Sequence, residues 1–181
     1  MTTELKTKRL LLRQWQDSDL EPLAKINADP DVMAYYPSVQ NAEQSTAMAH
    51  YFRDLIAQQG WGFWAVERLS DAQFIGFIGL NSPQYKLPVT PCVEIGWRLA
   101  RTAWGQGYAT EGAKAALNYA FDVLKLEQVY SFTSVANKRS RAVMERLAMH
   151  NENCNFEHPI IAKGHSLREH VLYKISNPAL K

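Results

Sequence analysis

Three glycines stand close together in the stretch WGQGYATEG, residues 104–112. An alanine-rich segment, AKAALNYAF, follows at once and has the spacing of a helix. The first amides of a helix have no partner within it, and the helix dipole places about half a positive charge there. Glycines let the backbone approach an anion closely. The stretch is therefore either a phosphate-binding turn or a plain tight turn, and the residues alone leave both open.

This stretch matches neither of two familiar nucleotide loops. No Gly-Lys-Ser/Thr follows it, which excludes a Walker A loop. The GxGxxG pattern of dinucleotide-binding folds is not satisfied, and the preceding segments have the pattern of an antiparallel meander. The stretch by itself is therefore weak support for a ligand, and the elements around it must decide.

The bulk composition is that of an ordinary globular protein. The chain has 181 residues, 46% apolar and 21% charged, which suits one domain with a sizeable core. A net charge of +2 is too small to favour nucleic acid or a membrane as the main partner. Cys92 and Cys154 stand too far apart in sequence to suggest a disulfide framework or a zinc site. Neither a secretory signal nor a membrane-spanning run is present, so we expect a cytoplasmic protein.

The hydrophobic pattern predicts a single α/β domain over residues 1–181. Three strands that look like an antiparallel meander follow two helices, and a strand-helix-strand-helix-strand order completes the chain. The helix over 41–59 is identified by Ala47, Tyr51 and Leu55, four residues apart. The expected strands are 8–15, 62–67, 73–80, 92–100, 128–135 and 170–175, and the expected helices are 20–26, 41–59, 109–124 and 138–149.

Several segments together resemble the GNAT (GCN5-related) N-acetyltransferases, in the branch of the ribosomal-protein N-terminal acetyltransferases. These segments are TKRLLLRQWQDSDLEPL, GFIGL, VEIGWRLARTAWGQGYATEGAKAALNYAF, VANKRSRAVMERLAM and HPIIAKGHSLREHVLYKI. The resemblance covers almost the whole chain. It implies the fold of that family, a mixed and mostly antiparallel central sheet with splayed strands, flanked by helices. It also implies acetyl-CoA as cosubstrate and an amine acceptor, either a peptide N-terminus or a small molecule.

The resemblance assigns cofactor-binding residues. The family's pyrophosphate loop, Arg/Gln-x-x-Gly-x-Gly/Ala, matches residues 104–109, with Trp104 in the first position. The resemblance further implies that the strand at 93–100 bonds the pantetheine arm and the acetyl carbonyl through its backbone. Asn137 either contacts the cofactor or simply caps the following helix. The implied contacts are Trp97, Arg98, Leu99, Gly105, Gln106, Gly107, Tyr108, Ala109, Thr110 and Asn137.

Two side chains are candidates for catalysis by resemblance. Amines are mostly protonated at neutral pH, so acetyl transfer benefits from a base, and a carboxylate with a raised pKa can serve. Glu94 lies on the strand where related enzymes carry a glutamate; the alternative is a surface ion pair with Lys or Arg. Ser140 would lie near the sulfur and donate a proton, unless water protonates the thiolate. The tyrosine that many GNAT enzymes use as acid is replaced here by Met144.

Three other features depart from the pattern or invite a different interpretation. Ala148 stands where the family usually has glycine, and alanine adopts a left-handed cap only at a cost, so we expect the turn at 150–153 to be built differently. The histidines at 158, 165 and 170 do not share a helical face, so the spacing favours tail contacts or a pocket lining over a metal site. Tyr35 and Tyr36 either shape the acceptor pocket or belong to the core.

Two other functions compete with acetyl transfer. One is a catalytically silent module that binds or senses acyl-CoA, and the other is a nucleotide-phosphate binder outside the family. The identity of the acceptor and the oligomeric state, a homodimer included, are left open by the sequence.

Overall fold

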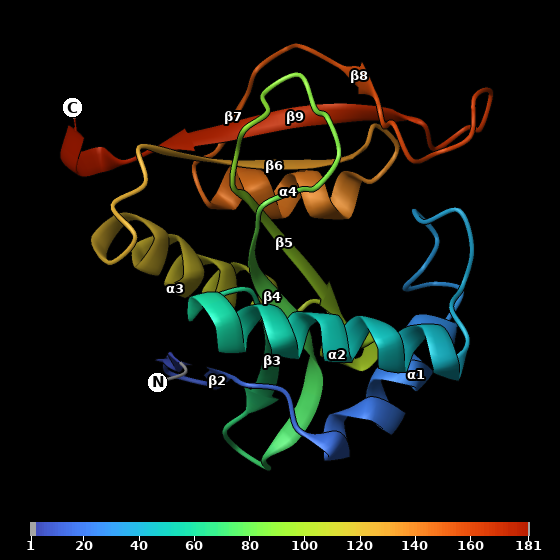
Figure 1. The fold of residues 1–181 in the computed structure, drawn as a ribbon, viewed down its shortest axis with the longest axis vertical. Coiled ribbons are helices and arrows are strands. Elements are labelled where there is room, and N and C mark those ends of the chain that lie inside the picture. Colours follow the sequence, from blue (N-terminus) through green and yellow to red (C-terminus); the bar gives the residue numbers. More distant parts are fainter. Residues whose placement is uncertain (1–2, 181) are drawn as a thin grey trace.

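The computed structural model describes residues 3–180, which form one central sheet with helices on its faces (Figure 1). The strands are β1 (Leu5–Lys6), β2 (Leu10–Arg13), β3 (Phe63–Arg68), β4 (Gln73–Asn81), β5 (Glu94–Leu99), β6 (Gln128–Ser134), β7 (His150–Asn151), β8 (Phe156–Glu157) and β9 (Glu169–Ser176). The α-helices are α1 (Leu20–Ala28), α2 (Ala42–Gln59), α3 (Tyr108–Asp122) and α4 (Lys138–Arg146). No helix within this range is long and apolar enough to cross a membrane.

The strand order is β1-β2-β3-β4-β5-β6-β9-β7, with β8 also paired to β9. Every pairing is antiparallel except the one between β5 and β6. A single parallel contact therefore joins the N-terminal meander to the C-terminal strands. The predicted α/β class with a mixed, mostly antiparallel sheet is confirmed.

The parallel pair β5–β6 is short. Its register holds one pair, Glu94 with Tyr130, and the Tyr130 amide donates to the Val93 carbonyl at 3.0 Å. The Ser131 hydroxyl adds one bond to the Ile95 carbonyl at 2.9 Å. Past this point each strand keeps only its other neighbour, β4 for β5 and β9 for β6. The two strands diverge, and the C-terminal half of β5 faces an open notch.

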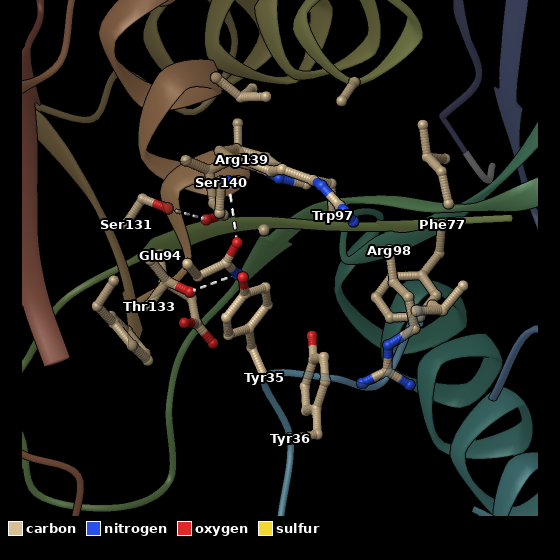
Figure 2. A pocket seen from close by; sticks show the side chains of 18 of the residues that line it. Tyr35, Tyr36, Phe77, Glu94, Trp97, Arg98, Ser131, Thr133, Arg139 and Ser140 are labelled. Atoms are coloured by element: carbon tan, nitrogen blue, oxygen red, sulfur yellow. Dashed lines mark hydrogen bonds between the residues drawn. The ribbon is translucent and has the colours of Figure 1, made fainter. Parts of the chain in front are cut away.

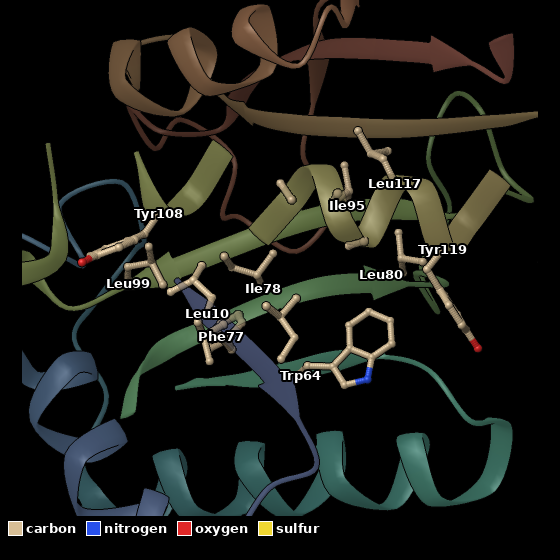
Figure 3. Packing of buried hydrophobic residues seen from close by; sticks show 14 of the residues in the cluster. Leu10, Trp64, Phe77, Ile78, Leu80, Ile95, Leu99, Tyr108, Leu117 and Tyr119 are labelled. Carbon is tan, nitrogen blue, oxygen red and sulfur yellow. The ribbon is translucent and has the colours of Figure 1, made fainter. Parts of the chain in front are cut away.

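Helix α3 covers the sheet with a face of small residues. Ala113, Ala116 and Ala120 are fully buried, and a Cβ at Gly112 would lie 2.5 Å from Ile78 Cδ1. Because these side chains are small, the helix approaches β4 and β5 closely. Figure 3 shows sheet residues such as Ile78, Leu80 and Ile95 packed beneath the helix.

Helix α2 has the predicted extent but buries a different face. The residues whose spacing identified the helix include Tyr51, which is 48% exposed. The ring of Phe52 instead faces the sheet, 5.0 Å from the ring of Phe63 and 5.3 Å from that of Phe77. Aromatic packing thus decides which face turns inward. The buried residues are Ser45, Ala49, Phe52 and Ile56.

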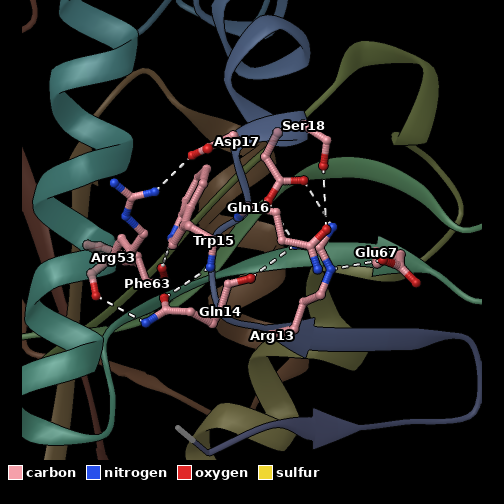
Figure 4. Close-up of polar contacts among 10 residues, drawn as sticks. Arg13, Gln14, Trp15, Gln16, Asp17, Ser18, Arg53, Phe63 and Glu67 are labelled. Carbon is pink, nitrogen blue, oxygen red and sulfur yellow. Dashed lines mark hydrogen bonds and ion pairs between the residues drawn. The ribbon is translucent and has the colours of Figure 1, made fainter.

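A buried ion pair fixes the entry to α1. Arg13, at the end of β2, makes two hydrogen bonds to Asp19 at 2.8 and 2.9 Å and a third to Glu67 at 2.8 Å (Figure 4). The Trp15 indole donates to the Phe63 carbonyl at 2.7 Å in the same region. Bidentate arginine–carboxylate bonds set orientation as well as distance. The segment that leads into α1 and α2 is therefore held rigidly against β2 and β3.

Helix α4 ends in a left-handed turn despite its alanine. Ala148 has a φ of 59°, and its amide donates to the Glu145 carbonyl at 3.0 Å. The Met149 amide donates to the Met144 carbonyl at 3.0 Å, which completes a Schellman motif. The left-handed cap that we expected alanine to disfavour therefore forms at Ala148, and the alanine bears its conformational cost.

We expect Ala148→Gly to stabilise the protein. The left-handed conformation costs a non-glycine residue about 1–2 kcal/mol, and glycine avoids this cost. The greater conformational freedom of glycine in the unfolded chain cancels part of the gain. The free energy of unfolding in urea should rise by roughly 0.5–1 kcal/mol. The matched control is Ala47→Gly, an exposed site inside α2, which should lower it by about 1 kcal/mol. A loss of stability in Ala148→Gly would show that the turn carries no strain.

Candidate active site

The notch between β5 and β6 opens into a cavity of about 1140 Å³. Residues of the glycine loop, of β5 and of the segment that follows α1 line it. Figure 2 shows the part of the cavity around Tyr35, Glu94 and Ser140 from close by. A volume of this size exceeds that of a pocket for one drug-sized ligand. All the predicted site residues line this cavity except Gln106.

The glycine loop presents unpaired amides. Gly105 and Gly107 have φ values of 74° and 80°, and Gly107 is the N-cap of α3 without a side chain to cap it. Helices α2 and α4, by contrast, are capped by the side chains of Asn41 and Asn137. Within residues 3–180, the successive backbone N–H groups from Gly105 to Thr110 have no hydrogen-bond acceptor. Such a row of free donors at a helix N-terminus binds anions.

A clamp from the N-terminal strand holds this loop from behind. Arg9 donates from Nη1 to the Gln106 carbonyl at 2.9 Å and from Nε to Glu111 at 2.7 Å. Its guanidinium also lies 4.5 Å from the ring centre of Tyr108. Burial opposes the ionisation of Glu111, but hydrogen bonds from Thr7 and Arg9 outweigh it and lower the pKa of this carboxyl. Sequence analysis missed both ends of the clamp. The one local signal was an acidic residue in the first turn of a helix.

Trp104 links three parts of the site. Its indole N–H donates to the Leu99 carbonyl at 2.9 Å, at the end of β5. The guanidinium of Arg139, in the first turn of α4, stacks 4.4 Å from its ring centre. The residue in the first position of the loop therefore holds the open end of β5 beside the start of α4, a role that the sequence did not indicate.

The register of β5 separates the residues expected to contact the cofactor. The carbonyls of Val93 and Ile95 face β6, so by alternation the backbone groups of Trp97 and Leu99 face the notch. By the same alternation the backbone groups of Arg98 face β4, as does the amide of Ala100, which donates to the Ile75 carbonyl at 2.9 Å. The expected backbone contact of Arg98 does not fit this register. Its side chain instead enters the cavity (Figure 2).

Glu94 lies where β5 and β6 part. The carboxylate is half-buried and accepts a hydrogen bond of 2.7 Å from Asn81 Nδ2. No Lys or Arg within residues 3–180 forms an ion pair with it, so the alternative of a surface ion pair is not what the structure shows. Burial raises the pKa of Glu94 to about 7, and the Asn81 hydrogen bond opposes part of that rise. A carboxylate of this kind can accept a proton near neutral pH.

Ser140 faces Glu94 across the notch, in the first turn of α4 (Figure 2). The backbone amide of Ser140 donates to Asn137 Oδ1 at 3.2 Å, and Asn137 Nδ2 donates to Thr133 Oγ1 at 2.9 Å. Asn137 is thus the N-cap that its type and position indicated. Because the cap uses the amide of Ser140, its hydroxyl remains free to form a hydrogen bond with a ligand in the cavity. Met144 is fully buried and belongs to the core.

Neutral rings close the cavity near Glu94. The rings of His158 and His170 lie 4.8 Å apart, and His158 also lies 5.0 Å from Tyr85 and 5.8 Å from Phe132. Burial lowers the pKa of His158 to about 4, and the nearby charges of His170 and Arg168 act in the same direction. His165 does not line the cavity. No group of three His, Cys, Asp or Glu within residues 3–180 could hold a metal ion.

Comparison with known proteins identifies the family. The acetyltransferase (GNAT) domain model matches residues 9–150. A GNAT-family acetyltransferase from Bacillus anthracis has the same structure with a TM-score of 0.80 and 26% identity, over 97% of this chain and 99% of that one. The FsC-acetyl coenzyme A-N(2)-transacetylase of Aspergillus fumigatus is 32% identical, over 77% of this chain and 62% of its own.

The ribosomal-protein branch has this fold as well. The ribosomal-protein-S5-alanine acetyltransferase of Vibrio fischeri superposes with a TM-score of 0.76 at 14% identity, over 99% of both chains. At that identity the likeness concerns the fold alone. The matched domain, the splayed strands and the uncapped glycine loop agree with one another, and the chain belongs to the GNAT family of acetyltransferases.

Proposed function

We propose that residues 1–181 form one N-acetyltransferase domain, which transfers acetyl from acetyl-CoA directly to a primary amine. The observation that carries this proposal is the placement of Glu94. It is a carboxylate without a cation partner, with a pKa near neutrality, at the point where the notch opens. Both substrates are present together in this reaction, and the cavity is large enough for two ligands.

The cofactor would lie along the notch with its pyrophosphate at the glycine loop. The free amides from Gly105 to Thr110 supply the donors for the phosphate oxygens. The backbone groups of Trp97 and Leu99 supply partners for the pantetheine arm and the acetyl carbonyl, while Asn137 lines the opposite wall. The name of the Aspergillus relative points to the same acetyl donor.

Acetyl transfer then requires that one proton is removed from the amine and that one is given to the leaving thiolate. The amine nitrogen attacks the thioester carbon while Glu94 accepts a proton from it, so that a tetrahedral intermediate forms. The carbonyl double bond then re-forms as the C–S bond breaks, and the electron pair of that bond leaves with the sulfur. Ser140, across the notch, donates a proton or a hydrogen bond to the leaving thiolate. Amides at the notch hold the carbonyl oxygen as its charge grows.

Substitution of Gly107 should weaken CoA binding more than it destabilises the fold. A Cβ there meets only Arg9 Nη2 at 3.5 Å, so the folded protein tolerates it apart from the φ of 80°. The same Cβ would stand in the anion site. We expect Gly107→Ala to weaken CoA binding at least about tenfold by calorimetry.

The matched control is Gly60→Ala. Gly60 has a φ of 85° and open space at its Cβ, and it lies at the end of α2 away from the loop. Gly60→Ala should lower the free energy of unfolding by about as much as Gly107→Ala does, and it should leave the affinity for CoA unchanged. Equal affinity losses in the two variants would count against the anion site, and tighter binding of ATP than of CoA would favour a nucleotide-phosphate binder.

Glu94→Gln should lower kcat/KM at least about tenfold while CoA affinity stays the same, because the general base is lost. The wild-type rate should fall as pH drops below about 7, since the raised pKa leaves Glu94 protonated there. The variant should lack this dependence. Asn81→Leu removes the hydrogen bond that lowers this pKa, so its acid limb should move up by about one pH unit on the same amine.

An unchanged rate in Glu94→Gln would remove this residue from the mechanism. If no amine in a broad panel is acetylated although CoA binds, the protein is a silent acyl-CoA module instead.

Ser140→Ala should lower kcat about tenfold or more with little change in KM, because the hydroxyl acts on the leaving thiolate in the transition state. Ser140→Thr keeps a hydroxyl and should retain most of the rate. Both variants preserve the backbone amide that Asn137 caps. A wild-type kcat in Ser140→Ala would mean that water protonates the thiolate.

A further inference from the structure

The side chain of Arg98 carries a buried positive charge in neutral surroundings. It is 8% exposed, and Nη1 donates to Asn27 Oδ1 at 2.8 Å. Its guanidinium lies 4.2 Å from the ring centre of Tyr36 and 5.2 Å from that of Phe77. No carboxylate within residues 3–180 forms an ion pair with it.

The orientation of this guanidinium is fixed from one side. Asn27, which accepts from Nη1, donates to Ser45 Oγ at 3.0 Å, and Ser45 donates to the Asn41 carbonyl at 2.8 Å. Both Asn27 and Ser45 are fully buried. This chain of hydrogen bonds joins β5 to α1 and α2. Nη1 is therefore occupied, whereas the opposite edge of the guanidinium makes no hydrogen bond within residues 3–180.

That opposite edge consists of Nε and Nη2. Nε is buried without a hydrogen-bond partner, and Nη2 has no partner within residues 3–180. Nε–H and Nη2–H point in parallel and match the two oxygens of a carboxylate. A buried charge with unpaired donors is costly, and stacking on two rings offsets only part of that cost.

The other cation at this end of the cavity is already paired. Arg101 forms an ion pair with Asp31 where the side chains of both are more than half exposed. Asp31 lines the cavity, but it is used at the mouth rather than at Arg98. The other arginines that line the cavity, Arg139 and Arg146, are exposed, so Arg98 is its one buried, unpaired guanidinium within residues 3–180. Between Arg98 and Glu94 the wall includes Tyr35 and the ring of Phe63, which lies against Gly96.

We propose that Arg98 binds a carboxylate of the acceptor, so that the acceptor is a small amine with an apolar body and a carboxylate at its far end. This inference rests on the proposed acetyl transfer at Glu94. Glu94 and Arg98 are on the same face of β5, about 13 Å apart along the strand. The amine lies at Glu94, the apolar body lies against the aromatic wall, and the carboxylate pairs with Arg98. A polyamine would bring a second positive charge to this guanidinium and is disfavoured.

The test compares acceptors that differ only in the carboxylate. Amino carboxylates of increasing chain length, aliphatic and aromatic, are paired with their carboxamides, and kcat/KM is measured for each. The N-acetylated forms of the same compounds are titrated into the CoA-loaded protein by calorimetry. This second arm measures recognition without turnover. In the wild type we expect at least one carboxylate to exceed its carboxamide at least about tenfold in both arms.

Arg98→Met should bring that ratio close to one, and Arg98→Lys, which keeps the charge without the paired donors, should give an intermediate ratio. The ratio within each variant cancels any change in stability or CoA affinity. The control Arg101→Met removes the exposed cation that pairs with Asp31, a residue of the cavity wall, and should leave the wild-type ratio.

Equal binding of carboxylates and carboxamides by the wild type would overturn the proposal, as would an undiminished ratio in Arg98→Met or no binding of either class. Carboxylate preference in calorimetry without turnover would support the Arg98 site and contradict acetyl transfer. Turnover of amines without a preference for carboxylates would support acetyl transfer and contradict the Arg98 site.

Discussion

The site depends on how briefly β5 and β6 pair. One register pair at Glu94 and Tyr130 joins the two halves of the sheet, and beyond it the strands diverge. Side chains satisfy the exposed carbonyls of β5, since Ser131 donates to Ile95 and Trp104 donates to Leu99. No described side chain accepts from the backbone amides on this edge. Two of the carbonyls on this edge are therefore occupied while the amides of Trp97 and Leu99 stay free within the described part of the chain, which suits a ligand rich in oxygen.

Charge is distributed along one face of β5 so that its two ionisable groups do not neutralise each other. Arg98 is held toward α1 by Asn27 and covered by Tyr36, well away from Glu94. A cation beside Glu94 would favour the carboxylate and lower its pKa. His158, which also lines the cavity, adds no such cation, because burial keeps it neutral near pH 7. The separation leaves the carboxyl of Glu94 and the guanidinium of Arg98 on one strand without an ion pair between them.

The sequence predicted what local pattern determines. Strand alternation placed Glu94 and Arg98 on one face, and the glycines marked the turn that precedes α3 and leaves its amides unpaired. It could not predict contacts between distant segments, such as Arg9 with Glu111 or Asn81 with Glu94. It also missed which backbone groups of β5 face the notch, because that depends on the register with β4 and β6. Residue type defined the candidates, and long-range pairing decided their roles.

The unpaired groups of the site have a cost, which neighbouring contacts offset. Free amides at the loop, the open edge of Arg98 and the buried carboxyl of Glu94 each oppose folding without a ligand. The clamp of Arg9 and Glu111 holds the loop, and the buried bonds of Arg13 hold the start of α1. Unpaired donors thus lie at the glycine loop and at Arg98, and the carboxyl of Glu94 lies at the start of β5 where the strands part. Under the proposed reaction, an acceptor bound at Arg98 and acetyl-CoA bound at the loop would both have to reach Glu94, where the amine can lose its proton.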